Sequence, residues 1–268
     1  MSGIVRRSVL EVTGATRLTR EDALAEERPL AIRVDGHDVA VTLRTPGHDD
    51  ELALGFLAGE GLLARRADVA SIVTTPAACA DEPDRIELAL APGVRFDWSR
   101  FERHFAATAA CGLCGRAHLD ALRAGLVPMP LGAALEVARL FTLAERVRAM
   151  QHAFEATGGL HAAALCDAAL EPLVLREDVG RHNAVDKVCG WLLEHGGYGS
   201  GVGLLWVSGR AGAELVLKAA RARIPVMAAV GAPSSLAVTL AEAAGITLIG
   251  FLRGSRMNVY VGAERLSG

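Results

Sequence analysis

Two cysteines separated by two residues are the strongest candidates for chemistry in this sequence. Cys111 and Cys114 lie in the stretch "AACGLCGRAH", and a glycine follows each of them. The glycines leave both sulfurs open to solvent and to a partner, and Arg116 or His118 nearby would favour the thiolate. The thiolate is the form of cysteine that attacks a sulfur donor. We therefore interpret Cys111 and Cys114 as a reactive pair.

Other interpretations of this pair have less support. A structural zinc site needs four ligands, and the chain has no second Cys-x-x-Cys, so His104 or His118 would have to complete it. A structural disulfide is unsuited to a reducing compartment, and a thioredoxin-type pair normally opens a helix after an early strand. We predict no metal site. The three other cysteines stand singly in apolar surroundings, and we expect them to be core thiols: Cys79, Cys166 and Cys189.

Four loops form a second candidate site. They span residues 176–183, 208–214, 231–237 and 253–258, and each follows an expected strand. They combine glycine or serine with arginine, or present backbone amides at the start of a helix, and both features bind phosphate. Taken singly, such a loop is more often a solvated turn than a ligand contact. Their coincidence at one sheet edge predicts a pocket for a phosphorylated, nucleotide-like ligand.

This pocket differs from the standard nucleotide sites, because none of its loops matches G-x-G-x-x-G or a Walker lysine loop. Arg253 and Arg256 lie in the last loop, and we expect them to bind phosphate or guanine. We also expect His182 and Lys187 to line the pocket. The simpler alternative for this segment is a surface pair of His182 and Asp186, four residues apart on a helix.

The elements that would position these groups follow from the hydrophobic pattern. In the first hundred residues we predict mostly strands: a hairpin over 28–47 that turns at Asp35-Gly36, a helix over 49–64, and strands at 69–76 and 85–92. A long helix is predicted over 133–159, ended by two glycines, and a hairpin over 160–178. Helices then alternate with apolar strands: helices 184–197, 213–223 and 235–245, and strands 201–209, 224–231 and 246–252.

This alternation predicts an α/β fold with a mostly parallel sheet covered on both faces. We place this α/β domain at residues 131–268 and a smaller α+β part at residues 1–130, with the Cys-x-x-Cys loop at its end. The chain has 268 residues, 51% of them hydrophobic and 22% charged, with a net charge of −3. That charge gives no general attraction to nucleic acid or to an acidic membrane. We see neither a targeting signal nor a membrane-spanning apolar run, and we expect a cytoplasmic protein.

Taken together, these motifs resemble the formate dehydrogenase accessory sulfurtransferases, the FdhD family. The resemblance covers nearly the whole chain and rests on "TPGHDDELALGF", "CGLCG", "TGGLHAAAL", "EDVGRHNAVDK", "GAPSSLAVTLAEAAGITLIGF" and "RGSRMNVY". It implies a sulfurtransferase that accepts persulfide sulfur from a cysteine desulfurase. It implies delivery of that sulfur to the molybdenum or tungsten of a bis(molybdopterin guanine dinucleotide) cofactor, which formate dehydrogenase requires.

The resemblance also implies roles for particular residues. Cys111 would carry the persulfide, and Cys114 matches a second cysteine of less settled role. A cofactor-binding segment falls on Phe251, Leu252, Arg253, Gly254, Ser255 and Arg256, and GDP-like nucleotides would bind the same site. The implied fold is similar to that of cytidine deaminases, and the implied assembly is a homodimer.

Two rival functions remain to be weighed. A zinc deaminase requires a His-x-Glu and a later Pro-Cys-x-x-Cys, but this chain has no His-x-Glu, and Ala110 precedes Cys111. The second rival is a non-catalytic chaperone that binds the molybdenum cofactor and hands it over without moving sulfur. Its pocket would look the same, so only the thiols distinguish it from a sulfurtransferase.

Overall fold

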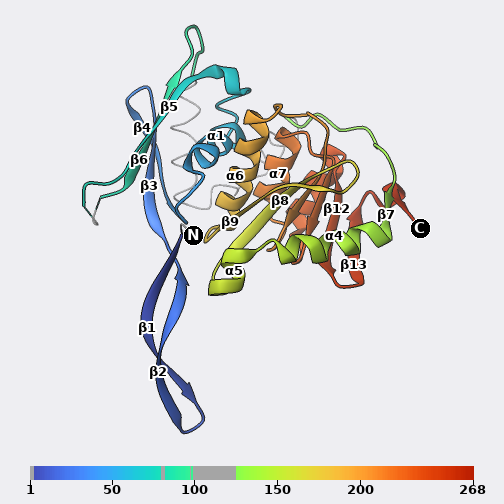
Figure 1. Ribbon diagram of the computed structural model, residues 1–268. Helices are drawn as coiled ribbons and strands as arrows, with labels where there is room; N and C mark the ends of the chain where they lie inside the picture. The colour runs from blue at the N-terminus through green and yellow to red at the C-terminus, as the bar shows by residue number, and fades with distance from the viewer. Residues whose placement is uncertain (1–2, 80–81, 97, 99–124) are drawn as a thin grey trace.

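The computed structural model describes residues 3–79, 82–96, 98 and 125–268 (Figure 1). Cys111 and Cys114 therefore lie outside the described residues. The larger sheet has six strands in the order β13-β12-β11-β10-β8-β9. Its strands are β8 (His161–Asp167), β9 (Pro172–Asp178), β10 (Val202–Val207), β11 (Val226–Ala229), β12 (Thr247–Arg253) and β13 (Arg256–Val261).

Strand direction in this sheet differs from the prediction. Only the neighbours β10–β11 and β11–β12 are parallel, whereas β8–β9, β8–β10 and β12–β13 are antiparallel. The expectation of a mostly parallel sheet is therefore wrong, and the sheet is mixed. A continuous apolar run shows that both faces of a strand are covered, and it carries no information about the direction of the neighbouring strand.

Helices cover both faces of the six-stranded sheet, as predicted. They are α4 (Val137–Ala149) on one face and α6 (Arg181–Glu194), α7 (Ala213–Arg221) and α8 (Ser235–Ala244) on the other. The two-residue period of β10 divides its side chains between these layers, because alternate residues of a strand point to opposite faces. Leu204 and Trp206 pack with α4, whereas Leu205 and Val207 pack with the other helices.

The smaller sheet has four strands in the order β4-β3-β6-β5 and packs on one helix. Its elements are β3 (Arg28–Val34), β4 (His37–Arg44), β5 (Val69–Thr75), β6 (Asp84–Leu90) and α1 (Asp49–Gly59). The predicted hairpin over 28–47 is confirmed, and Asp35 and Gly36 at its turn have φ of 47° and 80°. Helix α1 lies against α6, and this contact joins the smaller sheet to the larger one (Figure 1).

The predicted helix over 133–159 is interrupted, so that prediction is wrong in part. The segment forms β7 (Leu135–Glu136), α4 and then a separate short helix, α5 (His152–Thr157), with Gln151 at the break. The carboxylate of Glu177 on β9 accepts hydrogen bonds from the amides of Ala153 and Phe154 at 2.9 and 2.7 Å. This distant carboxylate caps α5 and stabilises a new helix start, because the first amides of a helix have no partner within it.

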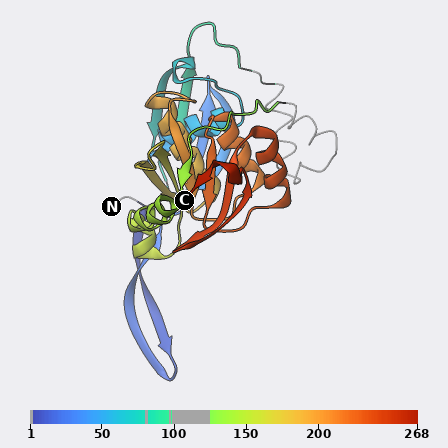
Figure 2. The same ribbon diagram turned by 90° about the vertical axis from the view of Figure 1, so that its right-hand side faces the viewer.

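A long two-stranded ribbon completes the fold. Strands β1 (Ile4–Thr13) and β2 (Thr16–Ala25) pair along their whole length and project away from the rest of the protein (Figures 1 and 2). Strand β2 contacts α5 at the base of the ribbon. The remaining elements are β14 (Leu266–Ser267), which pairs with β7, and the 3₁₀ turns Arg66–Asp68 and Ala263–Arg265. No helix among the described residues is long and apolar enough to cross a membrane.

Candidate ligand cavity

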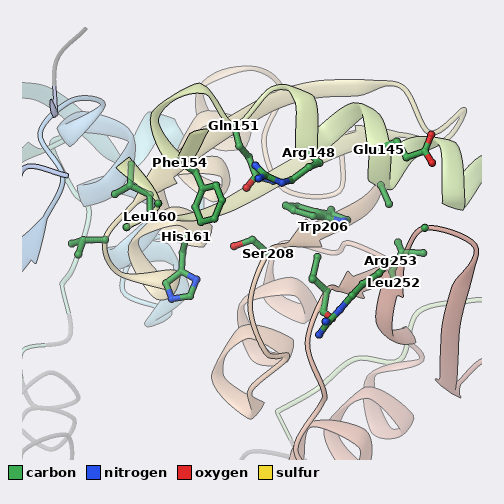
Figure 3. Close-up of a pocket in the computed structure, with 16 residues that line it drawn as sticks. Glu145, Arg148, Gln151, Phe154, Leu160, His161, Trp206, Ser208, Leu252 and Arg253 are labelled. Carbon is green, nitrogen blue, oxygen red and sulfur yellow. The ribbon is translucent and has the colours of Figure 1, made fainter. Parts of the chain in front are cut away.

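A cavity of about 570 Å³ lies where β10, β11 and β12 end, between the sheet and the α4–α5 segment (Figure 3). This is the carboxyl edge of the parallel strands, where ligands bind in open α/β sheets. The volume falls in the ordinary range for small-molecule sites, about 300–1,000 Å³. The cavity is lined by Ala144, Glu145, Arg148, Gln151, Phe154, Gly158, Gly159, Leu160, His161, Val179, Trp206, Ser208, Val230, Leu252, Arg253 and Gly254.

Three of the four loops expected at this edge contribute to the cavity. Val179, Ser208 and the pair Arg253 and Gly254 come from them, while Val230 immediately precedes the fourth loop. The Ser208 hydroxyl accepts a hydrogen bond from the Ala162 amide at 2.9 Å, which ties the end of β10 to the start of β8. The structure therefore brings together the segments that the sequence placed at one edge.

The segment from Phe251 to Arg256 contributes only in part. Leu252, Arg253 and Gly254 line the cavity, whereas Ser255 in the turn and Arg256 at the start of β13 are exposed. Phe251 has a φ of 55°, which is rare for a bulky side chain, and its amide donates to the carbonyl of Gly231 at 3.1 Å. This backbone arrangement presents the following Arg253 beside the β11 loop.

Charge at the cavity is predominantly positive. The Nε of Arg253 donates to the carbonyl of Val230 at 3.0 Å, which holds that guanidinium at the rim. The guanidinium of Arg148 lies over the ring of Phe154, 4.5 Å from its centre, and Glu145 supplies the one carboxylate of the lining. Burial and the nearby Arg181 lower the pKa of His161, so its imidazole stays neutral near pH 7.

Two buried donors in the cavity have no hydrogen-bond partner within the part of the chain that the structure describes. They are Nε2 of Gln151 and Nε1 of Trp206, and the two residues are 3% and 1% exposed. A buried N–H without an acceptor costs about 1–3 kcal/mol, so such groups need an explanation. Both residues line the cavity, but the two nitrogen atoms themselves are buried behind its surface (Figure 3). The sequence did not indicate either residue, because one is expected inside a helix and the other inside a strand.

Lys187 and His182 do not line this cavity, and the expectation that they would is wrong. The ammonium of Lys187 is 1% exposed, lies 2.7 Å from Oδ2 of Asp178 and donates to the carbonyl of Thr45 at 2.8 Å. His182 instead pairs with Glu214, with 2.8 Å between Nε2 and the carboxylate. A buried ammonium needs a charged partner, and Asp178 together with Thr45 supplies it at the contact between the two sheets.

The other polar side chains of the "EDVGRHNAVDK" motif also form contacts that stabilise the fold. Asp186 and Lys218 form a second buried pair, with 2.5 Å between the carboxylate and the ammonium. Burial raises the pKa of the Asp186 carboxyl, because the charged form loses its hydration. The Asn183 amide donates to the carbonyl of Leu43 at 2.7 Å, across the contact between the sheets. Asp178, Asn183 and Lys187 of this motif thus fasten the two sheets together.

The three cysteines that the structure describes differ from one another. Cys166 and Cys189 are 0% and 1% exposed, and burial raises the pKa of each thiol to about 12, which confirms them as inert core thiols. Cys79 is exposed, so the expectation of a core thiol there is wrong. It lies in the connection between β5 and β6, where the preceding Ala77 and Ala78 are not buried either.

Comparison with known proteins agrees with this fold. A solved structure from Desulfotalea psychrophila, described as a "putative formate dehydrogenase accessory protein", superposes with a TM-score of 0.78 at 23% sequence identity. The match covers 99% of this chain and 100% of that one. At this identity the match shows that the two chains share a fold.

Several curated relatives have a higher sequence identity to this chain than the solved structure has. Proteins named "Sulfur carrier protein FdhD" from Streptomyces coelicolor and Anaeromyxobacter dehalogenans are 47% and 48% identical, each over 98% of this chain and over 95% and 93% of their own length. The protein of that name from Mycobacterium tuberculosis is 47% identical over 97% of this chain and 98% of its own. The sequence profile of the FdhD/NarQ family matches residues 25–267. The chain therefore belongs to the FdhD/NarQ family.

Proposed function

We propose that this protein is a sulfurtransferase that carries persulfide sulfur from a cysteine desulfurase to a molybdenum or tungsten bis(molybdopterin guanine dinucleotide) client, for use by formate dehydrogenase. The name shared by its relatives supports the carriage of sulfur. The observation that carries the client assignment is the cavity, which combines apolar walls with two arginines. Such a site suits a flat and anionic ligand.

Sulfur transfer through Cys111 is thiol exchange. The Cys111 thiolate attacks the terminal sulfur of the desulfurase persulfide, the S–S bond of the donor breaks, and the donor cysteine leaves as a thiolate. Release of that sulfur as sulfide requires two electrons. Attack of the Cys114 thiolate on the inner sulfur of the Cys111 persulfide supplies them, because it forms a Cys111–Cys114 disulfide and frees one sulfide for the client.

The residues that the structure describes would bind the client cofactor, and we assign the carriage of sulfur to Cys111. Arg253 at the rim would bind a phosphate with charge-assisted hydrogen bonds, and Arg148 is the second cation available to the same group. The apolar walls, which include Leu160 and Leu252, would exclude water from the bound group. Pairing of two copies of the chain stays a proposal drawn from the family resemblance.

Replacement of the proposed carrier thiol tests the function. After incubation with a cysteine desulfurase and cysteine, we expect mass spectrometry to find one added sulfur atom on Cys111. Cys111→Ser is expected to abolish sulfur delivery and formate dehydrogenase maturation while leaving GDP binding intact. Cys79→Ser is the matched control, because Cys79 is an exposed thiol with no proposed role.

A non-catalytic chaperone predicts a different result. If Cys111→Ser still matures an active formate dehydrogenase, the protein holds and transfers the cofactor without carrying sulfur. Titration of GDP against the single variants Arg253→Ala and Arg256→Ala then tests the two arginines separately, since only Arg253 lines the cavity. Undiminished affinity in both variants would exclude phosphate binding by this segment.

A further inference from the structure

The β1–β2 ribbon is long for an isolated pair of strands, and the described part of its own chain leaves its outer half uncovered. Its ten residue pairs stand away from the rest of the protein (Figures 1 and 2). A two-stranded hairpin is marginally stable at best in water, and a third or fourth strand or a packed face is needed for independent stability. Leu10, Val12 and Leu18 are nevertheless 58%, 57% and 61% exposed on this ribbon. We therefore expect the ribbon to pack against another molecule.

The two faces of the ribbon differ in how their charges are satisfied. Residues directly opposite each other in antiparallel strands point to the same face. On the other side from Leu18, Arg17 has no ion pair within the part of the chain that the structure describes. On the face of Leu18, by contrast, Arg20 bonds the carboxylates of both Glu11 and Asp22. We call the first of these the open face, and its residues are Arg6, Ser8, Leu10 and Val12 of β1 and Arg17, Thr19, Glu21 and Ala23 of β2.

The charges of the open face are complementary to themselves under a twofold axis. Val12 and Arg17 lie opposite each other at one level of the ribbon, Ser8 and Glu21 lie opposite each other at a second level, and Leu10 lies midway. A twofold axis across the strands at the level of Leu10 packs two ribbons antiparallel, with Arg17 of each copy over Glu21 of the other. Leu10 of one copy then meets Leu10 of the other. A parallel packing instead lays Arg17 over Val12 and gives neither charge a partner.

We propose that the open face of the β1–β2 ribbon is a docking surface for the same face of a second copy of this chain, with the two ribbons antiparallel about Leu10. The inference rests on the pairing of two copies proposed with the function, and it names the surface that forms the pair. A strand of ten residues is about 33 Å long and a ribbon about 10 Å wide, so two such faces bury on the order of 1,000 Å² in total. This area is at the low end for specific interfaces, so the assembly depends on protein concentration.

Sedimentation velocity on the full chain, from about 1 µM to about 100 µM, tests the proposal. We expect the unaltered protein to form dimers within this range. Leu10→Ser should weaken dimerisation about tenfold or more, because each dimer loses two buried leucines. Leu18→Ser is the matched control, because Leu18 has nearly the same exposure but lies on the opposite face, and it should leave dimerisation unchanged. Circular dichroism checks that both variants keep the fold.

Charge reversal tests the register of the two ribbons. Arg17→Glu and Glu21→Arg should each weaken dimerisation about tenfold or more, because each places like charges opposite each other twice in a dimer. An equimolar mixture of these two variants should dimerise within about threefold of the unaltered protein, because every contact between them joins opposite charges. Pairing inside one chain does not explain such a rescue, since Arg17 and Glu21 are four residues apart on one strand, about 13 Å.

Two results would overturn the inference. One is an unaltered protein that stays monomeric up to about 100 µM, which would assign the open face to a different kind of partner. The other is a dimer that responds neither to Leu10→Ser nor to charge reversal, which would place the contact between copies elsewhere. Sulfur loading of Cys111 is a separate readout, so a failure there leaves this contact standing. Equally, a monomeric protein that still loads sulfur on Cys111 leaves the sulfur chemistry standing.

Discussion

Gly55 on α1 and Gly190 on α6 stand at the point where these two helices cross. A Cβ atom on Gly55 would lie 1.8 Å from the carbonyl oxygen of Asp186, and one on Gly190 would lie 1.8 Å from that of Glu51. The obstructing atoms are backbone atoms, which cannot move aside as the end of a flexible side chain can. The helix backbones are therefore in direct contact, and this contact holds the smaller sheet against the larger one.

Introducing a methyl group at this crossing should separate the helices. We expect Gly190→Ala to lower the free energy of unfolding by about 3 kcal/mol or more, at the upper end for overpacked cores. Chemical denaturation followed by circular dichroism measures the effect. Gly212→Ala is the control, because a Cβ there meets no atom within 4 Å, and we expect a loss below about 1 kcal/mol. Equal losses in the two variants would contradict the close crossing.

The buried ammonium of Lys187 gives a second prediction. Lys187→Met leaves the Asp178 carboxylate buried without its cation, and we expect a loss of about 3–5 kcal/mol in the free energy of unfolding. Adding Asp178→Asn should restore part of this loss in a double-mutant cycle. Arg146→Met breaks the exposed pair with Glu171 and should change stability little. Comparable effects at Lys187 and Arg146 would show that the buried pair is not strongly stabilising.

Stability should fall on mild acidification, partly because of His161. Its pKa is lowered in the folded protein by burial and by Arg181, whereas its ordinary value is 6.5. The unfolded chain therefore binds a proton that the folded chain resists, and stability present above pH 6.5 is lost as the pH falls through the folded pKa. His48 shifts in the same direction, through burial and Arg176.

The measurement is urea unfolding between about pH 7.5 and about pH 5.5, where histidines rather than carboxylates titrate. We expect His161→Gln to flatten the dependence of unfolding free energy on pH. His152→Gln alters an exposed imidazole on α5 and should leave the dependence as it is. A slope that is unchanged in His161→Gln would assign the acid sensitivity to other groups.

Local patterns predicted most of the individual elements of this fold. The turn at Asp35-Gly36 was visible because few residue pairs adopt two successive positive φ angles. The family assignment from "CGLCG" and "EDVGRHNAVDK" is confirmed by the match over residues 25–267. The meeting of the strand-end loops at one cavity followed from topology, since the three parallel strands β10, β11 and β12 end at one edge.

What the sequence did not indicate depends on contacts between distant residues. The break at Gln151 exists because Glu177, on a later strand, caps α5, and the helical period alone runs through that point. Lys187 was expected in the pocket, yet its partner Asp178 lies on the preceding strand and Thr45 on the other side of the sheet contact. The roles of Cys111 and Cys114 stay predictions, since both lie outside the described residues.

The volume of the cavity has a consequence for how the proposed client, which carries two nucleotide arms, would leave the protein. A space of about 570 Å³ has the size of one nucleotide, so the proposed bis-dinucleotide client would place one arm in this cavity and the other outside it. A receiving enzyme could then bind that outer arm before the inner arm dissociates from the cavity. Such an arrangement would permit direct transfer of the client to the receiving enzyme without its release into solution.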